Sequence, residues 1–100
     1  MPKCEVIVTE AAQDDLIEII EYIVNDNPTA AINLADEIEN NILGLGDFPD
    51  MGAIPKKRQL AMKGYRILVV NNFLVFYVVV GVIVEIRRII SSKRNYARLF

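Results

Sequence analysis

The first half of the chain places its apolar residues at the spacing of amphipathic helices. Cys4–Val8 is rich in β-branched residues and predicts a short strand. Thr9 follows it and is a residue type that caps the N-terminus of a helix. Two helical stripes come next, formed by Ala12, Leu16, Ile19, Ile20 and Ile23 and then by Ala31, Leu34, Ala35, Ile38, Ile42 and Leu45. Asn27-Pro28 separates the stripes, so the pattern predicts a helical hairpin whose apolar faces need a partner surface.

The second half is typical of strands separated by turn residues. Glycines and a proline mark a loop over residues 44–52. The predicted strands are a weak one at about Gln59–Met62, then Tyr65–Val70, Phe73–Val80 and Val82–Ile90. Residues 67–84 carry no charge and are numerous enough for a membrane helix. Asn71-Asn72 in their middle, which suits a hairpin turn, and their β-branched and aromatic content favour buried strands.

These elements together predict an α+β fold. An N-terminal strand and a helical hairpin would pack on a small, mostly antiparallel sheet of 4–5 strands. The chain has 100 residues, which suits one compact domain, and it shows no repeat or low-complexity stretch. We therefore expect a single domain over residues 1–100.

Charge is divided unevenly along the chain. Residues 1–55 contain twelve acidic side chains and one basic side chain, whereas residues 56–100 contain ten basic and one acidic. Such asymmetry indicates a negatively charged partner for the basic half. The chain has no histidine and only one cysteine, which excludes an internal disulfide. We expect no metal site and no cofactor, and any proton transfer would have to use Tyr, Lys, Glu, Asp or water.

Two arginines within predicted strands are candidates for a phosphate-binding site, because a guanidinium donates paired N–H groups to phosphate oxygens. Arg66 begins an apolar strand. In the last strand, alternation would place Arg88 with Ile86 and Ile90 on the side of the helices, and Arg87 on the other side with Glu85 and Ile89. A partly buried arginine must be paired or must face a cleft.

The tail adds Tyr96, whose ring could stack on a base. Other cations are candidates for binding a nucleic acid or a target protein, namely Lys56, Lys57, Arg58, Lys93 and Arg94. The alternative interpretation is a solvated basic rim that keeps an apolar sheet soluble.

The order of motifs resembles the RelE/ParE superfamily of type II toxins over nearly the whole chain. The matching segments are Thr9–Leu16, Ile20–Tyr22, Asn27–Ala31, Phe48–Gly52, Gly64–Arg66, Asn72–Tyr77, Ile86–Arg88 and Lys93–Tyr96. The Phe-Pro-x-x-Gly and Asn-x-x-x-Phe-Tyr elements are most similar to the ParE-like branch. The resemblance implies a helical hairpin on a small antiparallel sheet, and a cytoplasmic toxin neutralised by a cognate antitoxin.

The resemblance leaves the activity open between an enzyme and a binder. RelE-like members cut mRNA on the ribosome without a metal. Arg66 and Arg88 would then hold the scissile phosphate, Tyr96 would stack or assist proton transfer, and the RNA 2′-hydroxyl would be the nucleophile. ParE-like members inhibit DNA gyrase, so the basic tail would dock on protein, and Ser91 stands where the family often has a histidine. A third possibility is an inactive member that only forms complexes.

The antitoxin is expected to cover apolar side chains that the fold leaves exposed. Tyr22, Val24 and Ile32 lie outside the two main helical stripes, so they are candidates for this contact. Packing between the two helices is the alternative role for the same residues. The target would be the ribosome with mRNA or DNA gyrase, and we expect no contact with a membrane.

Overall fold

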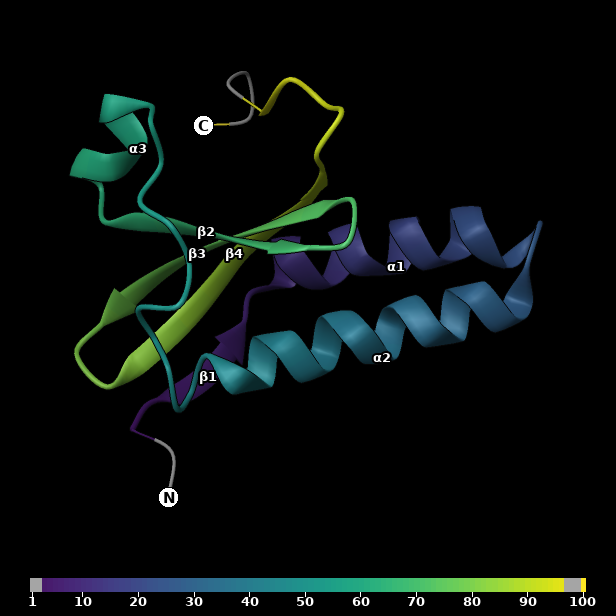
Figure 1. Cartoon of the computed structure of the whole chain (residues 1–100), viewed down its shortest axis with the longest axis horizontal. Helices are drawn as coiled ribbons and strands as arrows, with labels where there is room; N and C mark the ends of the chain where they lie inside the picture. The colour runs from purple at the N-terminus through teal and green to yellow at the C-terminus, as the bar shows by residue number, and fades with distance from the viewer. Residues whose placement is uncertain (1–2, 97–99) are drawn as a thin grey trace.

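The computed structural model describes residues 3–96 and residue 100. Its elements are β1 (Glu5–Val8), α1 (Glu10–Val24), α2 (Pro28–Gly44), α3 (Arg58–Met62), β2 (Tyr65–Val70), β3 (Phe73–Val80) and β4 (Ile83–Ser91). The strands form one sheet in the order β1-β4-β3-β2, with β1 parallel to β4 and the other pairs antiparallel. α1 and α2 lie side by side along one side of this sheet (Figure 1). The predicted α+β fold is confirmed.

The helical hairpin forms where Thr9 and the Asn27-Pro28 break predicted it. The Thr9 side chain accepts a hydrogen bond from the Ala12 amide at 3.3 Å, and the Asn27 side chain accepts one from the Ala30 amide at 3.1 Å. The apolar stripes then face the sheet. The main core joins them to strand residues, and its buried members include Ala12, Leu34, Ile38, Ile42, Leu45, Leu68, Val75, Tyr77, Val84, Ile86 and Ile89.

A second apolar cluster covers the opposite face of the sheet. Leu60 of α3 packs there against Tyr65, Phe76, Val78 and Ile90, which come from the three long strands. The weak strand predicted at Gln59–Met62 is wrong, because this segment forms α3. Gln, Leu, Ala and Met all favour helices, and a short helix buries Leu60 while leaving its neighbours exposed or half-buried.

A β-bulge in β4 changes which side chains face the helices. Tyr77 pairs with Ile86, but its neighbour Phe76 pairs with Arg88, so Arg87 is an extra residue in the ladder. Ile89 therefore packs in the main core and Ile90 packs on the opposite face, the reverse of the prediction. The prediction failed because strict alternation ends at a bulge. Ile86 faces the helices as expected. Arg87 lies beside Glu85, whose face it was expected to share, and the two form an ion pair at 2.9 Å.

Tight turns join β2 to β3 and β3 to β4, and both turns lie within the uncharged residues 67–84. Asn71 has φ +57° and Gly81 has φ +61°, both in the left-handed region that asparagine and glycine tolerate. The hairpin predicted at Asn71-Asn72 is confirmed. Within the described part of the chain, no helix combines the length and the apolar character needed to cross a membrane.

Candidate functional site

Arg88 lies where the sheet loses a strand. β1 ends at Val8, which pairs with Ile86, so the rest of β4 has no strand beside it on that edge. Asp15 of α1 takes this place: its Oδ2 accepts hydrogen bonds from the Ile89 amide at 3.0 Å and from Arg88 Nε at 2.7 Å. Its Oδ1 accepts a second bond from Arg88 Nη2 at 2.8 Å. One carboxylate thus completes the sheet edge and holds the arginine.

The Asp15–Arg88 pair is partly shielded from solvent. The exposed fractions of the two side chains are 12% for Asp15 and 25% for Arg88. The hydrogen bonds from Arg88 to Asp15 raise the pKa of the guanidinium above its ordinary value, against the opposing effect of burial. Two of the three guanidinium nitrogens therefore donate to an internal carboxylate, which balances the charge of Arg88 within the fold.

Arg66 lies on β2 and is held by the loop that precedes α3. Its Nη1 donates to the Gly52 carbonyl at 2.8 Å and to the Asp50 carbonyl at 3.3 Å, while Nη2 lies 3.7 Å from Asp50 Oδ1. Asp50 is 84% exposed, so this ion pair is screened by water. The main role of Arg66 in the structure is to bind loop carbonyls.

Tyr77 of β3 holds the same loop through two hydrogen bonds of its hydroxyl group. Its hydroxyl donates to the Pro49 carbonyl and accepts from the Gly52 amide, both at 2.8 Å. Burial raises the pKa of Tyr77 above its ordinary value of 10.0, and the nearby Asp50 charge adds to this. The Gly52 hydrogen bond and the Arg66 charge oppose it. Tyr77 therefore stays protonated at neutral pH and can donate to Pro49.

The predicted catalytic residues do not share one site. β3 separates Arg66 from Arg88, and their hydrogen-bond partners come from the Pro49–Gly52 segment and from α1 respectively. The Tyr96 ring packs on Phe76 with a centroid separation of 5.1 Å, in the cluster on the face away from the helical hairpin. The roles of Arg66, Arg88 and Tyr96 in chemistry stay predictions.

The predicted binding cations are spread over two places and are all exposed. Lys56, Lys57 and Arg58 lie at the start of α3, and Lys93 and Arg94 follow β4. Arg94 lines a groove beside α1, and Lys93 lines a neighbouring hollow beside Phe73. Their roles in binding also stay predictions.

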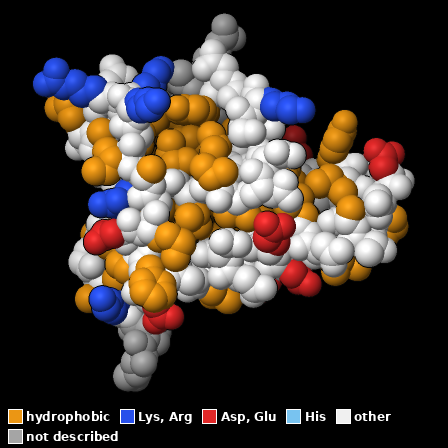
Figure 2. All heavy atoms as spheres, in the orientation of Figure 1, with side chains coloured by type: hydrophobic (Ala, Val, Ile, Leu, Met, Phe, Trp, Pro, Cys, Tyr) orange, Lys and Arg blue, Asp and Glu red, His pale blue; other side chains and the backbone are white. Residues whose placement is uncertain are grey.

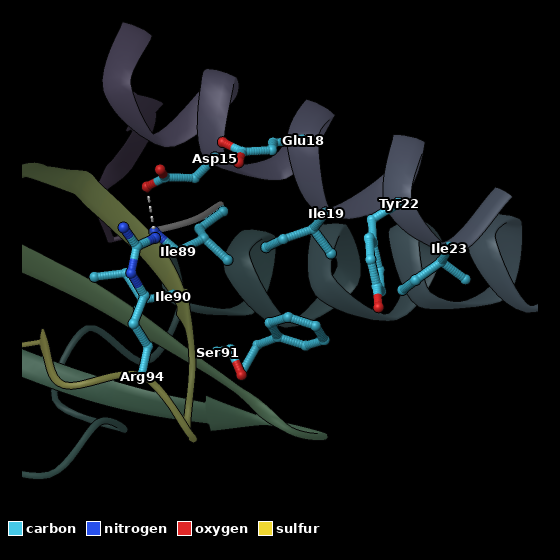
Figure 3. A pocket seen from close by; sticks show the side chains of 10 residues that line it. Asp15, Glu18, Ile19, Tyr22, Ile23, Ile89, Ile90, Ser91 and Arg94 are labelled. Carbon is cyan, nitrogen blue, oxygen red and sulfur yellow. Dashed lines mark hydrogen bonds between the residues drawn. The ribbon is translucent and has the colours of Figure 1, made fainter. Parts of the chain in front are cut away.

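A groove of about 310 Å³ opens beside the Asp15–Arg88 pair. Figure 3 shows Asp15, Glu18, Ile19, Tyr22 and Ile23 along α1 and Arg94 approaching from the segment after β4. Phe73, Ile89 and Ile90 add apolar surface from the strands. The groove is apolar with acidic residues at one end, and such a surface fits an apolar side chain of a protein partner.

Sequence reasoning missed the roles of Asp15 and Tyr77. Asp15 follows Ala12 by three residues and precedes Ile19 by four, so helical spacing already placed it on the inward face. Tyr77 lies within an apolar strand, where a buried hydroxyl must find a partner. The sequence pattern thus places both side chains inside the fold. It does not identify their partners, because each contact joins residues that are far apart in the chain.

Comparisons with known proteins agree with this architecture. The family described as ParE toxin of type II toxin-antitoxin system, parDE, matches residues 6–96. A solved structure described as the chromosomal ParDE TA system from P. aeruginosa shares 23% sequence identity and a TM-score of 0.75. That match covers 89% of this chain and 96% of the other and shows a common fold. No curated protein matches the sequence. Because the family match spans almost the entire chain, the protein belongs to the ParE toxin family of type II toxin–antitoxin systems.

Proposed function

We propose that this type II toxin acts as a non-enzymatic inhibitor of DNA gyrase and is neutralised by a cognate antitoxin. The observation that carries the proposal is the separation of the two strand arginines, each of which is bound to an internal partner. Metal-independent RNA cleavage needs donors that converge on one phosphate, with an acid or base beside them. A protein-binding inhibitor needs neither arrangement.

The tail of the chain also favours binding over cleavage. Tyr96 packs against Phe76 and is half-buried, so its ring is already used within the protein. The chain contains no histidine, and Ser91 occupies the end of β4. Two cations that follow β4, Lys93 and Arg94, are exposed and suited to contact with an acidic protein surface.

The helical layer supports the proposed antitoxin contact. Tyr22, Val24 and Ile32 are exposed, with Tyr22 at 79%, and they are not packed between the two helices. Tyr22 also borders the apolar groove between α1 and the strand ends. An antitoxin segment with apolar side chains could cover this layer and fill the groove.

Ribosome-dependent mRNA cleavage is the second candidate, and the exposed basic residues at 56–58 and 93–94 favour it. Three measurements on one purified toxin separate the possibilities. Expression without antitoxin should slow growth, the toxin should inhibit supercoiling by gyrase, and ribosome-bound mRNA should stay intact in primer extension. New mRNA ends with normal supercoiling would establish cleavage instead. Normal growth would indicate an inactive member of the family.

A further inference from the structure

The segment from Phe48 to Lys63 presents apolar side chains that folding does not use. Phe48, Met51, Ile54 and Met62 have exposed fractions between 51% and 75%, and none belongs to either core cluster. Ile54 and Ala61 line one hollow, so the loop and α3 form a continuous surface, which we call the 48–63 surface. Figure 2 shows hydrophobic and basic side chains together around this part of the molecule. Exposed apolar area of this kind marks a binding site.

The loop in this surface is held in a fixed conformation. Tyr77 bonds both Pro49 and Gly52, and Ala53 exchanges backbone hydrogen bonds with Ile67 at 2.9 and 2.8 Å. A Cβ atom on Gly52 would lie 2.7 Å from Tyr77 Cε1 and Oη, so any larger residue there would force the loop or the ring to shift. A loop fixed before binding loses little entropy when a partner docks, and this favours affinity.

The charge of this surface indicates the chemistry of its partner. Lys56, Lys57, Arg58 and Lys63 are exposed, and none has a carboxylate partner among the residues that the structure describes. The sequence contains no acidic residue from Met51 to Val84. The one acidic residue within the segment, Asp50, lies 3.7 Å from Arg66. The next acidic residue along the chain is Asp47, just before the segment begins. A partner with acidic and apolar side chains would complement this surface.

The two apolar surfaces of the toxin differ in charge and so fit different partners. The groove on α1 is lined by Glu18, by Asp15, which pairs with Arg88, and by Arg94, so its charges nearly balance. The 48–63 surface is basic, because its lysines and Arg58 have no carboxylate partner among the residues that the structure describes. Its apolar side chains are mostly aliphatic, whereas RNA recognition relies on aromatic rings that stack on bases. A protein partner therefore fits the 48–63 surface better than RNA does.

We propose that the 48–63 surface docks an acidic segment of the toxin's protein target, with Ile54 and Met62 as apolar anchors. The Tyr77–Gly52 contact positions the loop for this interaction. This inference rests on the proposed function, since it assigns part of the toxin surface to the target and leaves the helical layer to the antitoxin. It adds a docking site defined by residues 48–63, apart from the described cations Lys93 and Arg94, which line hollows beside α1 and the end of β4.

The test compares two double variants that each remove two exposed apolar side chains. Ile54→Ser/Met62→Ser alters the 48–63 surface, and Val80→Ser/Val82→Ser alters the exposed turn between β3 and β4 as a matched control. Binding of the purified full-length toxin to purified gyrase is measured alongside co-purification with the antitoxin. We expect the first variant to lose about tenfold or more in gyrase affinity and to keep the antitoxin. The control variant should keep both interactions.

Charge reversal gives a second measurement on the same surface. Lys56→Glu/Lys57→Glu should slow association with gyrase and weaken the dependence of association on salt, because exposed charges act mainly on the rate of encounter. Equal gyrase binding by the native toxin and by Ile54→Ser/Met62→Ser would overturn this inference while leaving the proposed function intact. If that variant lost only antitoxin binding, the surface would belong to the antitoxin and the inference would be overturned. If it lost only binding to phosphatidylglycerol vesicles, the surface would bind lipid and the inference would be overturned as well. Failure of the native toxin to bind gyrase would reject both proposals.

Discussion

The two strand arginines of this toxin lie on β2 and β4, with β3 between them, and they contact different kinds of partner. Arg88 is bound by a carboxylate that is itself shielded and that also closes the edge of β4. Arg66 is bound mainly by two backbone carbonyls, and its carboxylate neighbour Asp50 is open to water. The first arrangement balances charge inside the fold, whereas the second uses a charged side chain to shape a loop. The same residue type thus stabilises the helix–sheet junction in one place and the loop before α3 in the other.

The comparison predicts that stability depends on the Asp15–Arg88 pair and that function depends on the loop. A shielded pair that loses one member leaves an uncompensated charge, so its disruption is costly. Backbone acceptors near the surface can turn to water when their donor is removed. Substitutions at the two sites should therefore differ in size and in which measurement responds.

The largest effect is expected from Asp15→Ala. The change leaves the Arg88 guanidinium unpaired and the Ile89 amide without its acceptor, and it should lower the free energy of unfolding by about 2–4 kcal/mol. Urea denaturation followed by circular dichroism measures this loss. Asp14→Ala is the matched control on the exposed face of α1, with an expected change within about 0.5 kcal/mol. Similar losses in the two variants would mean that Asp15 does not close the sheet edge.

Gly52→Ala should have the next largest effect. Its Cβ would lie 2.7 Å from the Tyr77 ring and hydroxyl, so loop or ring must shift, and we expect a loss of about 1–3 kcal/mol. Gly44→Ala serves as control, because a Cβ there meets nothing within 4 Å and alanine favours the helix. Thermal unfolding of both proteins should show a lower Tm for the first and an unchanged or higher Tm for the second. Equal Tm values would show that the loop yields without strain.

Arg66→Ala should lower stability less than Asp15→Ala does. The loop carbonyls lose their donor but stay close to water, and the expected loss is about 0.5–1.5 kcal/mol. Asp50→Ala, which removes only the exposed member of the ion pair, should change stability by less than about 1 kcal/mol. Urea midpoints for these two variants and for Asp15→Ala, measured together, test whether the two arginine sites differ in their contribution to stability. A loss with Arg66→Ala as large as that with Asp15→Ala would remove the distinction between the two arginine sites.

The smallest effect concerns alkaline pH and the Tyr77 contact. Because burial raises the pKa of Tyr77 in the folded protein above 10.0, the folded state keeps this proton more tightly than the unfolded chain does. The resulting contribution to stability is complete below pH 10 and is lost as pH rises further. Urea midpoints measured between pH 8 and pH 11 should fall more steeply for the native protein than for Tyr77→Phe. Parallel curves would mean that Tyr77 titrates alike in both states.

Local patterns in the sequence determined most of the architecture. Helical spacing located α1 and α2, the residues Thr9 and Asn27 marked where they begin, and Asn71 marked the hairpin between β2 and β3. These features depend on neighbours a few residues apart, so they are readable without the fold. The ordered motifs resemble the ParE-like branch, and the family match over residues 6–96 agrees with them.

Tertiary structure decided what the charged residues do. The bulge at Arg87 exchanged the expected positions of Ile89 and Ile90, since a ladder irregularity depends on how two strands pair. The partner of Arg88 is 73 residues away in the chain, and Gly52 is 25 residues from Tyr77. No spacing rule relates residues at such separations, because only the folded backbone brings them within hydrogen-bond distance. The sequence by itself therefore determined most of the elements and the family, and packing decided which internal partner each strand arginine contacts.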